Sequence, residues 1–186
     1  MRISPEVIGI VVAVVAVVWI IAAFNGLVAL RTRVQTAWAQ IDVQLKRRHD
    51  LIPNLVEAVR GYMQYEHSAL EAVTQARSQA MAAGGNIEQR SASEAALTAA
   101  IGRVFAVAEN YPQLRASENM QMLQEQITST ENRISYARQF YNDEVMKYNT
   151  AQSTFPRNML AGLFGFSPGA MFATDDTDRS NVQVKL

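Results

Sequence analysis

The strongest constraint on this chain is an apolar run near its N-terminus. From Val7 to Phe24, eighteen consecutive residues carry no charge. As a helix this run spans about 27 Å, close to the roughly 30 Å hydrocarbon core of a bilayer. A cleaved signal peptide usually has an apolar core of only about 7–15 residues, with its small-x-small site after the core. Here the nearest such site, at 21–23, lies inside the run. We therefore predict a tail and transmembrane anchor over residues 1–30, with bilayer contact through residues 7–30.

Basic residues follow the apolar run. Arg31 and Arg33 lie just beyond it and are expected at the membrane interface. Their excess over Arg2 predicts a short external N-terminus and a cytoplasmic C-terminal domain. A straight helix would carry the later basic cluster about 22–25 Å from the membrane surface, beyond the roughly 8 Å screening length. We interpret this cluster as a candidate docking face for a protein partner. It comprises Lys46, Arg47 and Arg48. Simple solvation is the more common explanation for all five side chains, because Lys and Arg readily occupy surfaces.

Apolar residues recur at helical spacing over residues 31–155. The first stripe runs through Val34, Trp38, Ile41 and Leu45. It resumes after Pro53, where either a new helix begins at Leu51 or one long helix kinks, and it continues to a stop at 84–85. A shorter helix follows over about 87–108, and a last long helix opens at Ser117 and ends by Pro156. Its expected buried residues include Met122, Phe140 and Tyr141. The pattern predicts an all-α chain, with a transmembrane helix followed by an antiparallel up-and-down bundle of three or four long helices.

Residues 156–186 read as an apolar and then acidic tail. We favour packing of its apolar stretch across the bundle, because exposed patches this apolar are rare in soluble domains. The alternatives are a second membrane contact and a contact between subunits. The side chains concerned are Leu160, Leu163, Phe164 and Phe166. The acidic part contains Asp175, Asp176 and Asp178.

Composition excludes several classes of chemistry. There is no cysteine, so thiolate metal sites and thiol catalysis are absent, and the net charge of +0 gives no support to nucleic-acid binding. His49 and His67 are the only histidines, and neither forms the Glu-x-x-His spacing of a di-iron bundle. We interpret Asp42, His49 and Glu57 as partners of neighbouring basic residues on a solvated surface. The sequence thus predicts no catalytic, metal or cofactor site.

Two segments closely resemble the LemA family signature. The first comprises Leu30–Val34 and Ala37–Glu57, continued by Glu66 and Ala76-Arg77; the second is Phe155-Pro156 with residues 161–166. The last 18 residues fit no part of that pattern. The resemblance implies a bacterial membrane protein with a cytoplasmic helical bundle and brings no catalytic motif. It also implies relatives associated with membrane-protein quality control, near membrane metalloproteases, and with magnetosome membranes.

These observations favour a non-enzymatic, membrane-anchored scaffold or adaptor. Its expected location is the bacterial inner membrane, which it crosses once. We expect protein partners, with a membrane metalloprotease or a second copy of the chain as candidates, because a tether raises the local concentration of whatever the bundle meets. The alternative is a membrane-shaping or lipid-contacting oligomeric assembly.

Overall fold

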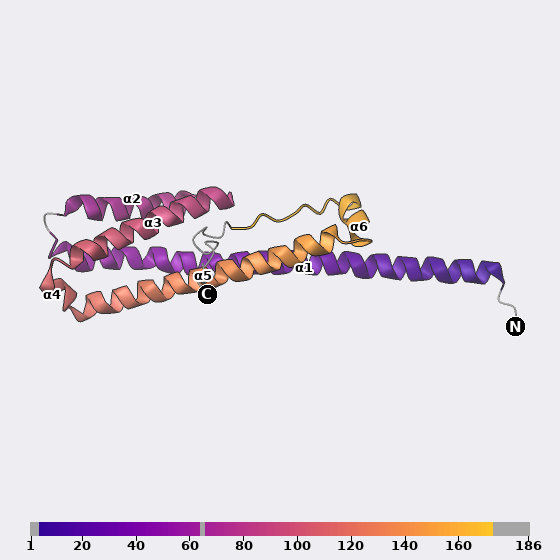
Figure 1. Cartoon of the computed structure of the whole chain (residues 1–186), viewed down its shortest axis with the longest axis horizontal. Helices are drawn as coiled ribbons and strands as arrows, with labels where there is room; N and C mark the ends of the chain where they lie inside the picture. Colours follow the sequence, from indigo (N-terminus) through magenta and orange to yellow (C-terminus); the bar gives the residue numbers. More distant parts are fainter. Residues whose placement is uncertain (1–3, 64–65, 173–186) are drawn as a thin grey trace, which may run out of the picture. The chain divides into compact units, whose positions relative to one another are not determined.

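The computed structural model describes residues 4–63 and 66–172, which form two compact units. The anchor unit contains residues 4–40 and 139–170, and the bundle unit contains residues 41–63, 66–138 and 171–172. Two long helices contribute to both units, α1 (Pro5–Arg60) and α5 (Glu118–Ser153). Throughout the described ranges the regular structure is helical, as the sequence predicts (Figure 1).

Helix α1 carries the apolar run and the first amphipathic stripe without a break between them. Its residues from Val7 to Ile21 expose their large apolar side chains, and this stretch is long and apolar enough to cross a membrane. The first buried side chains are Ala23 and Leu27, where other parts of the anchor unit begin to cover the helix.

Pro53 lies inside α1 and does not end it. A proline in a helix interior costs about 3 kcal/mol, because its ring removes a hydrogen bond and crowds the preceding turn. Ile52 and Leu55, on either side of it, are both buried in the core, so packing holds the helix through the proline. The helix ends at Arg60, just before Gly61.

A second helix then begins, so the predicted continuous helix up to residue 84 is wrong. Helix α2 (His67–Ala82) starts after a break that interrupts the apolar stripe, with Glu66 at its N-cap. The only local sign of this break is the single Gly61, whose cost in a helix interior is about 1 kcal/mol. The chain reverses direction there, and that reversal lets α2 pack against its neighbours.

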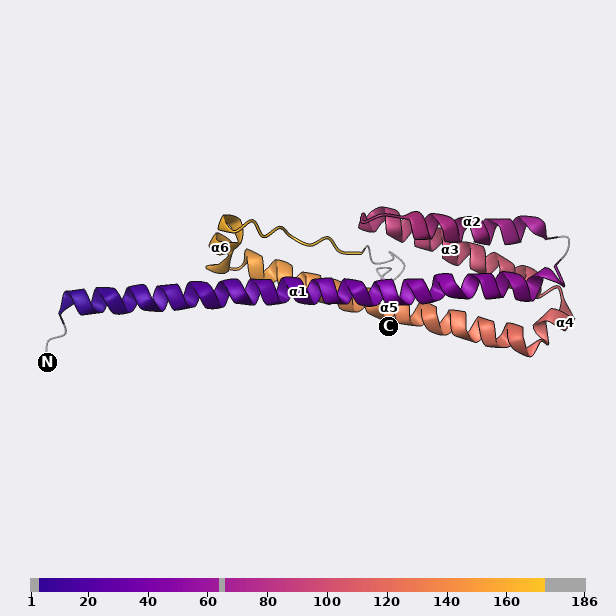
Figure 2. The same cartoon turned by 180° about the vertical axis from the view of Figure 1, so that it is seen from behind.

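Four helical segments build the bundle unit. The end of α1, then α2, α3 (Ile87–Ala108) and the first part of α5 alternate in direction, as both views show (Figures 1 and 2). Asn86 caps α3, since its side chain accepts a hydrogen bond of 2.9 Å from the Glu88 amide. A short helix, α4 (Pro112–Arg115), precedes α5. The core contains Ile52, Leu55, Val59, Met63, Val73, Ala76, Ala80, Leu97, Ala100, Ile101, Val104, Ala108, Leu114, Met120 and Ile127.

The buried face of α5 differs from the predicted one at two positions. Met122 and Phe140 are exposed, whereas Met120 and Tyr141 are buried. Each residue turns a helix by about 100°, so Met122 lies about 200° from Met120 and Phe140 about 100° from Tyr141. Burial of Met120 and Tyr141 therefore directs the other two side chains outward.

In the anchor unit, α5 is followed by helix α6 (Arg157–Leu163). The helix ends with Gly165 at a φ of +68°, a conformation that favours glycine. The Phe166 amide donates to the Ala161 carbonyl at 3.0 Å, which completes a Schellman cap and turns the chain back.

The returning segment, residues 167–170, is then bonded to α5. Tyr148 donates to the Ser167 carbonyl at 3.1 Å, and Asn149 exchanges two hydrogen bonds with Gly169. A Cβ at Gly169 would lie 3.1 Å from a methyl group of Val145, so a larger residue there would have to displace that side chain by a few tenths of an ångström. These bonds hold the segment that follows α6 against α5, so the chain on either side of α6 is attached to α5.

Candidate functional site

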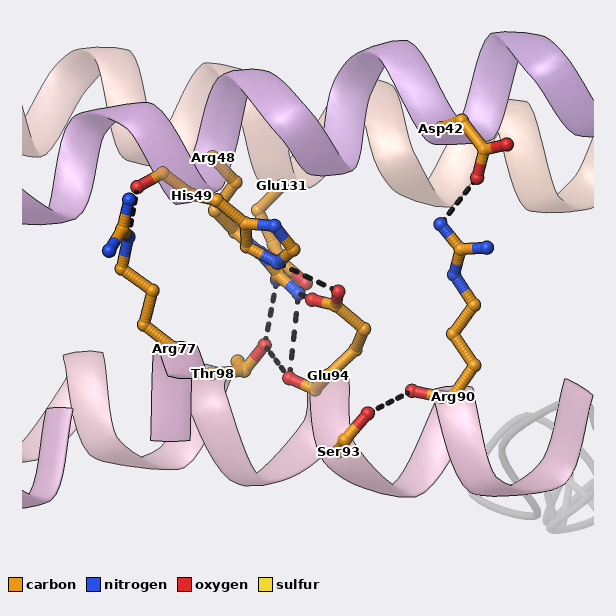
Figure 3. A network of polar contacts seen from close by, with 9 residues as sticks. All are labelled: Asp42, Arg48, His49, Arg77, Arg90, Ser93, Glu94, Thr98 and Glu131. Atoms are coloured by element: carbon orange, nitrogen blue, oxygen red, sulfur yellow. Dashed lines mark hydrogen bonds and ion pairs between the residues drawn. The ribbon is translucent and has the colours of Figure 1, made fainter. Parts of the chain in front are cut away.

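A network of charged and polar side chains, buried at Arg48, His49 and Glu94, lies in the bundle unit (Figure 3). The Arg48 side chain on α1 is 1% exposed and forms ion pairs with Glu94 on α3 and Glu131 on α5. It also donates to the Thr98 hydroxyl at 2.9 Å. The neighbouring His49 lies 2.9 Å, Nε2 to Oε1, from the same Glu94 carboxylate.

This network joins all four helical segments of the bundle unit. Arg77 on α2 completes it, because its Nε donates to the His49 carbonyl at 2.7 Å. A buried charge that loses its partner is left without compensation, which costs free energy. The register of the helices that keeps these partners together is therefore lower in free energy than registers that separate them. The residues on which the resemblance rests include Arg48, His49 and Arg77. In the structure these three residues link α1 to α2, α3 and α5.

The electrostatics of Glu94 follow from this geometry. Burial by itself raises the pKa of a carboxyl group, but the hydrogen bond from His49 and the charge of Arg48 outweigh burial and hold the Glu94 pKa below its ordinary value. Glu94 is therefore an ionised carboxylate at neutral pH. With its oxygens directed at Arg48 and His49, it is engaged inside the protein.

The structure corrects two interpretations of this region. Arg48 was predicted as a docking residue, but its burial removes it from the surface. Asp42 and His49 were expected to pair with neighbouring basic residues on a solvated surface, but they pair with Arg90 and Glu94 of α3.

A signal for Arg48 was present in the sequence. It lies three residues after Leu45 and four before Ile52, within the apolar stripe of α1. Glu94 is placed in the same way, three residues before Leu97 on α3. A charge in each of two facing stripes predicts a buried pair, provided that the two helices are known to face each other.

The other members of the basic cluster remain at the surface. Lys46 and Arg47 are exposed, and Lys46 forms an ion pair of 3.3 Å with Asp50. Arg31 and Arg33 are exposed on α1 in the anchor unit, a little beyond the first buried residues. Trp38, expected in the core, is half-buried with its ring 5.4 Å from that of Tyr141.

The apolar stretch of the tail packs against the end of the apolar run of α1. The rings of Phe164 and Phe166 meet the Phe24 ring edge-on, with centroids 5.0 and 5.7 Å away. Leu160 is buried and Phe166 is half-buried, whereas Leu163 and Phe164 are exposed. Of the four predicted contact residues, Leu160 and Phe166 thus face inward, Leu163 faces outward, and Phe164 is half exposed with its ring also on Phe24.

An open groove of about 1180 Å³ lies in the bundle unit between the end of α1 and α2. Its apolar lining comes from Val56, Met63 and Leu70, which also belong to or pack against the core. Its polar lining comprises Arg60, His67, Glu71, Thr74, Gln75 and Ser78. Among the residues that the structure describes, no group of three or more His, Asp and Glu side chains is placed to hold a metal ion.

Comparison with known proteins relates the chain to two kinds of relative. It is 27% identical to "Magnetosome protein MamQ 2" of Paramagnetospirillum magneticum over 191 residues, which cover 87% of this chain and 70% of the relative. It is 26% identical to "Magnetosome protein MamQ" of Magnetospirillum gryphiswaldense over 168 residues, or 77% of this chain and 62% of the relative. It is also 25% identical to "Protein LemA" of Metamycoplasma hominis over 164 residues, or 86% of this chain and 73% of the relative.

The model of the LemA family matches residues 37–186. That range includes the last 18 residues, which sequence analysis placed outside the family pattern, so that interpretation is corrected. The acidic tail residues Asp175, Asp176 and Asp178 lie outside the described residues. An apolar helix fit to cross a membrane, an all-helical fold and a family match over most of the sequence agree with one another, and the chain belongs to the LemA family.

Proposed function

We propose that this protein is a membrane-anchored, non-enzymatic adaptor that binds protein partners through its bundle unit. The observation that carries the proposal is that one helix, α1, contains both the candidate membrane span and a wall of the open groove. A tether raises the effective concentration of the groove near other membrane proteins, so weak docking contacts suffice.

The groove suits a helical or extended segment of a protein. Its volume of about 1180 Å³ exceeds the roughly 300–1,000 Å³ typical of small-molecule pockets. Val56 and Leu70 supply an apolar floor backed by the core, while Arg60 and Glu71 place both signs of charge on the rim. An amphipathic helix presents a matching pattern, an apolar stripe with flanking charges.

Site-specific photo-crosslinking in native membranes tests this proposal. A photoreactive amino acid replaces Gln75, which lines the groove, or Gln79, an exposed glutamine on the same helix outside the groove. We expect discrete protein adducts from position 75 and few from position 79. Equal labelling from both positions, or none from either, would refute groove docking.

The identity and location of the partner are further parts of the proposal. The resemblance favours a membrane metalloprotease in quality control as the partner, and a second copy of the chain is the other candidate. Exposed Lys46 and Arg47 offer an additional docking surface. Arg31 and Arg33 support an inner-membrane position with a cytoplasmic bundle. Alkaline phosphatase fused after residue 172 should then be inactive, and an active fusion would reverse the orientation.

A second candidate function is a lipid-contacting or membrane-shaping oligomeric assembly. The observation that favours it is the similarity to proteins named as magnetosome proteins, over more than three quarters of this chain. Reconstitution of the full chain into vesicles, followed by electron cryomicroscopy and mass measurement, tests this alternative. Monomeric protein in vesicles of unchanged diameter would exclude it.

A further inference from the structure

Helix α6 carries a face of exposed apolar side chains. Met159 and Leu163 lie four residues apart on α6 and are 68% and 77% exposed. Phe155, just before the helix, and Phe164, at its C-cap, are 75% and 50% exposed. A spacing of four places side chains on one side of a helix. The opposite side, with Leu160 and Ala161, is buried against the anchor unit.

This exposed face lies at a defined level along the anchor. Phe164 packs on Phe24, the last residue of the apolar run. The Arg157 guanidinium lies 4.0 Å from where a Cβ of Gly26 would sit. If the run from residue 7 to residue 24 fills the hydrocarbon core, α6 lies beside α1 where that core ends.

We propose that the exposed face of α6 inserts into the interfacial layer of the bilayer, beside the anchor, and gives the chain a second membrane contact. The inference rests on the proposed anchoring by α1. The bilayer is the occupant because the apolar face adjoins the helix whose side chains from residue 7 to residue 21 are already exposed for lipid. Short amphipathic segments at this depth commonly lie in the membrane plane.

Basic side chains at the same level fit this placement. Arg157 is exposed on α6, and Arg31 and Arg33 are exposed on α1 one to two turns beyond the Gly26 contact. Long basic side chains direct their charges to the headgroup layer while their stems cover apolar surface. The arrangement therefore resembles an interfacial anchor, with apolar groups facing the acyl chains and cations facing anionic headgroups.

The second contact also has a structural consequence within the anchor unit. A single helix can rotate about its own axis in a bilayer, whereas a helix with an interfacial segment fixed to one side cannot do so without withdrawing apolar groups from lipid. Contacts from Phe164 and Phe166 to Phe24 and the bonds of residues 167–170 to α5 hold α6 on that side. These contacts therefore keep the proposed second membrane contact on one side of α1.

The absence of cysteine from the sequence makes single-cysteine labelling direct. The full chain is prepared with Met159→Cys or Leu163→Cys, each carrying a polarity-sensitive fluorophore. It is reconstituted into vesicles of phosphatidylcholine and phosphatidylglycerol. Met146→Cys is the matched control, an exposed methionine of the same unit on α5. Val15→Cys, inside the apolar run, reports the anchor itself. Lipids with a nitroxide at a shallow or a deep acyl position act as quenchers.

We expect blue-shifted emission at positions 159 and 163 and preferential quenching by the shallow nitroxide. The quenching should be at least about twofold stronger than at position 146, since interfacial helices lie roughly 5–10 Å into the headgroup and acyl boundary. Quenching as weak as at position 146, while position 15 is quenched by the deep nitroxide, would overturn the α6 contact alone. Loss of quenching at position 15 as well would overturn the anchoring and with it this inference.

A second copy of the chain covering α6 is distinguished by the same samples. Fluorophores at positions 159 and 163 would then be blue-shifted and shielded from aqueous iodide, yet unquenched by either lipid nitroxide, and that result would refute the bilayer as the occupant. Both substituted side chains are exposed, so the labels leave the packing of Leu160 and Ala161 unchanged. Retained far-ultraviolet circular dichroism checks this point.

Discussion

Replacement of Arg48 by methionine tests the role of the buried charge network. Methionine has a similar length and fills most of the same space, so the substitution removes the charge and leaves only a small cavity. The variant loses the ion pairs with Glu94 and Glu131 and the bond to Thr98. Glu94 then stays buried, with His49 as the remaining partner at 2.9 Å.

The expected cost follows from the isolation of Glu94. Removal of one partner from a buried ion pair destabilises a protein by about 3–5 kcal/mol, because the other charge is left without compensation. This is a large fraction of the roughly 5–15 kcal/mol that stabilises a typical domain. A urea m-value of about 2 kcal/mol/M converts the loss into a midpoint lower by roughly 2 M.

The assay is urea unfolding of the detergent-solubilised full chain, followed by circular dichroism. Arg47→Met is the matched control, since Arg47 is the adjacent residue and is exposed on the same helix. Its effect should stay within about 0.5 kcal/mol, as for most surface substitutions. If the two single variants unfold at the same urea concentration, the network contributes nothing and the reasoning is refuted.

A double variant separates lost charge compensation from lost packing. Arg48→Met combined with Glu94→Met removes both buried charges, and apolar replacement of a whole buried pair is often neutral or better. We expect the double variant to be more stable than Arg48→Met alone. A double variant that loses the sum of both single effects would show that packing, and not charge, dominates.

Three further predictions follow from single residues. Folding lowers the Glu94 pKa, so the stability that ionised Glu94 contributes is fully present above the unfolded pKa of about 4.3 and is lost as the pH falls through the folded pKa. Glu94→Gln should therefore be less stable than the original chain at pH 7, and its stability should fall less steeply with acid. An unchanged loss of stability in acid would contradict this. Gly102 lies inside α3, and an added Cβ would meet no atom within 4 Å. Gly102→Ala should therefore stabilise the bundle unit by about 0.5–1 kcal/mol in the same urea assay. A lower urea midpoint would contradict this prediction. Phe24→Ala removes the edge-on ring contacts from Phe164 and Phe166, each of which stabilises by about 0.5–1.5 kcal/mol beyond area burial. Protease cleavage near α6 should therefore accelerate. An unchanged cleavage rate would show that α6 is held without these ring contacts.

The helical elements were largely predictable because their signals are local. The apolar run, the stripe through Ile41 and Leu45, and the opening of α5 after Ser117 each follow from residues within a few turns of one another. The break after Arg60 was missed because one glycine is a weak stop signal, and packing of α2 decided the outcome. Pro53 is the reverse case, a strong local signal that the surrounding core overrides.

The candidate sites depended on contacts between residues distant in sequence. The exposed state of Lys46 and Arg47 agrees with the surface position predicted for them, but the burial of Arg48 could not be read from its own surroundings alone. Its partners lie 46 and 83 residues away, on helices whose pairing no local pattern specifies.

An apolar helix long enough to cross a bilayer, followed by further helices, could be predicted from the residue pattern, since apolar length and periodicity act within a single segment. The shared buried site of Arg48 and Glu94 and the packing of α6 on Phe24 became visible only in the folded chain. Burial and charge compensation belong to pairs of surfaces. Their energies are defined only once the fold has chosen which surfaces meet.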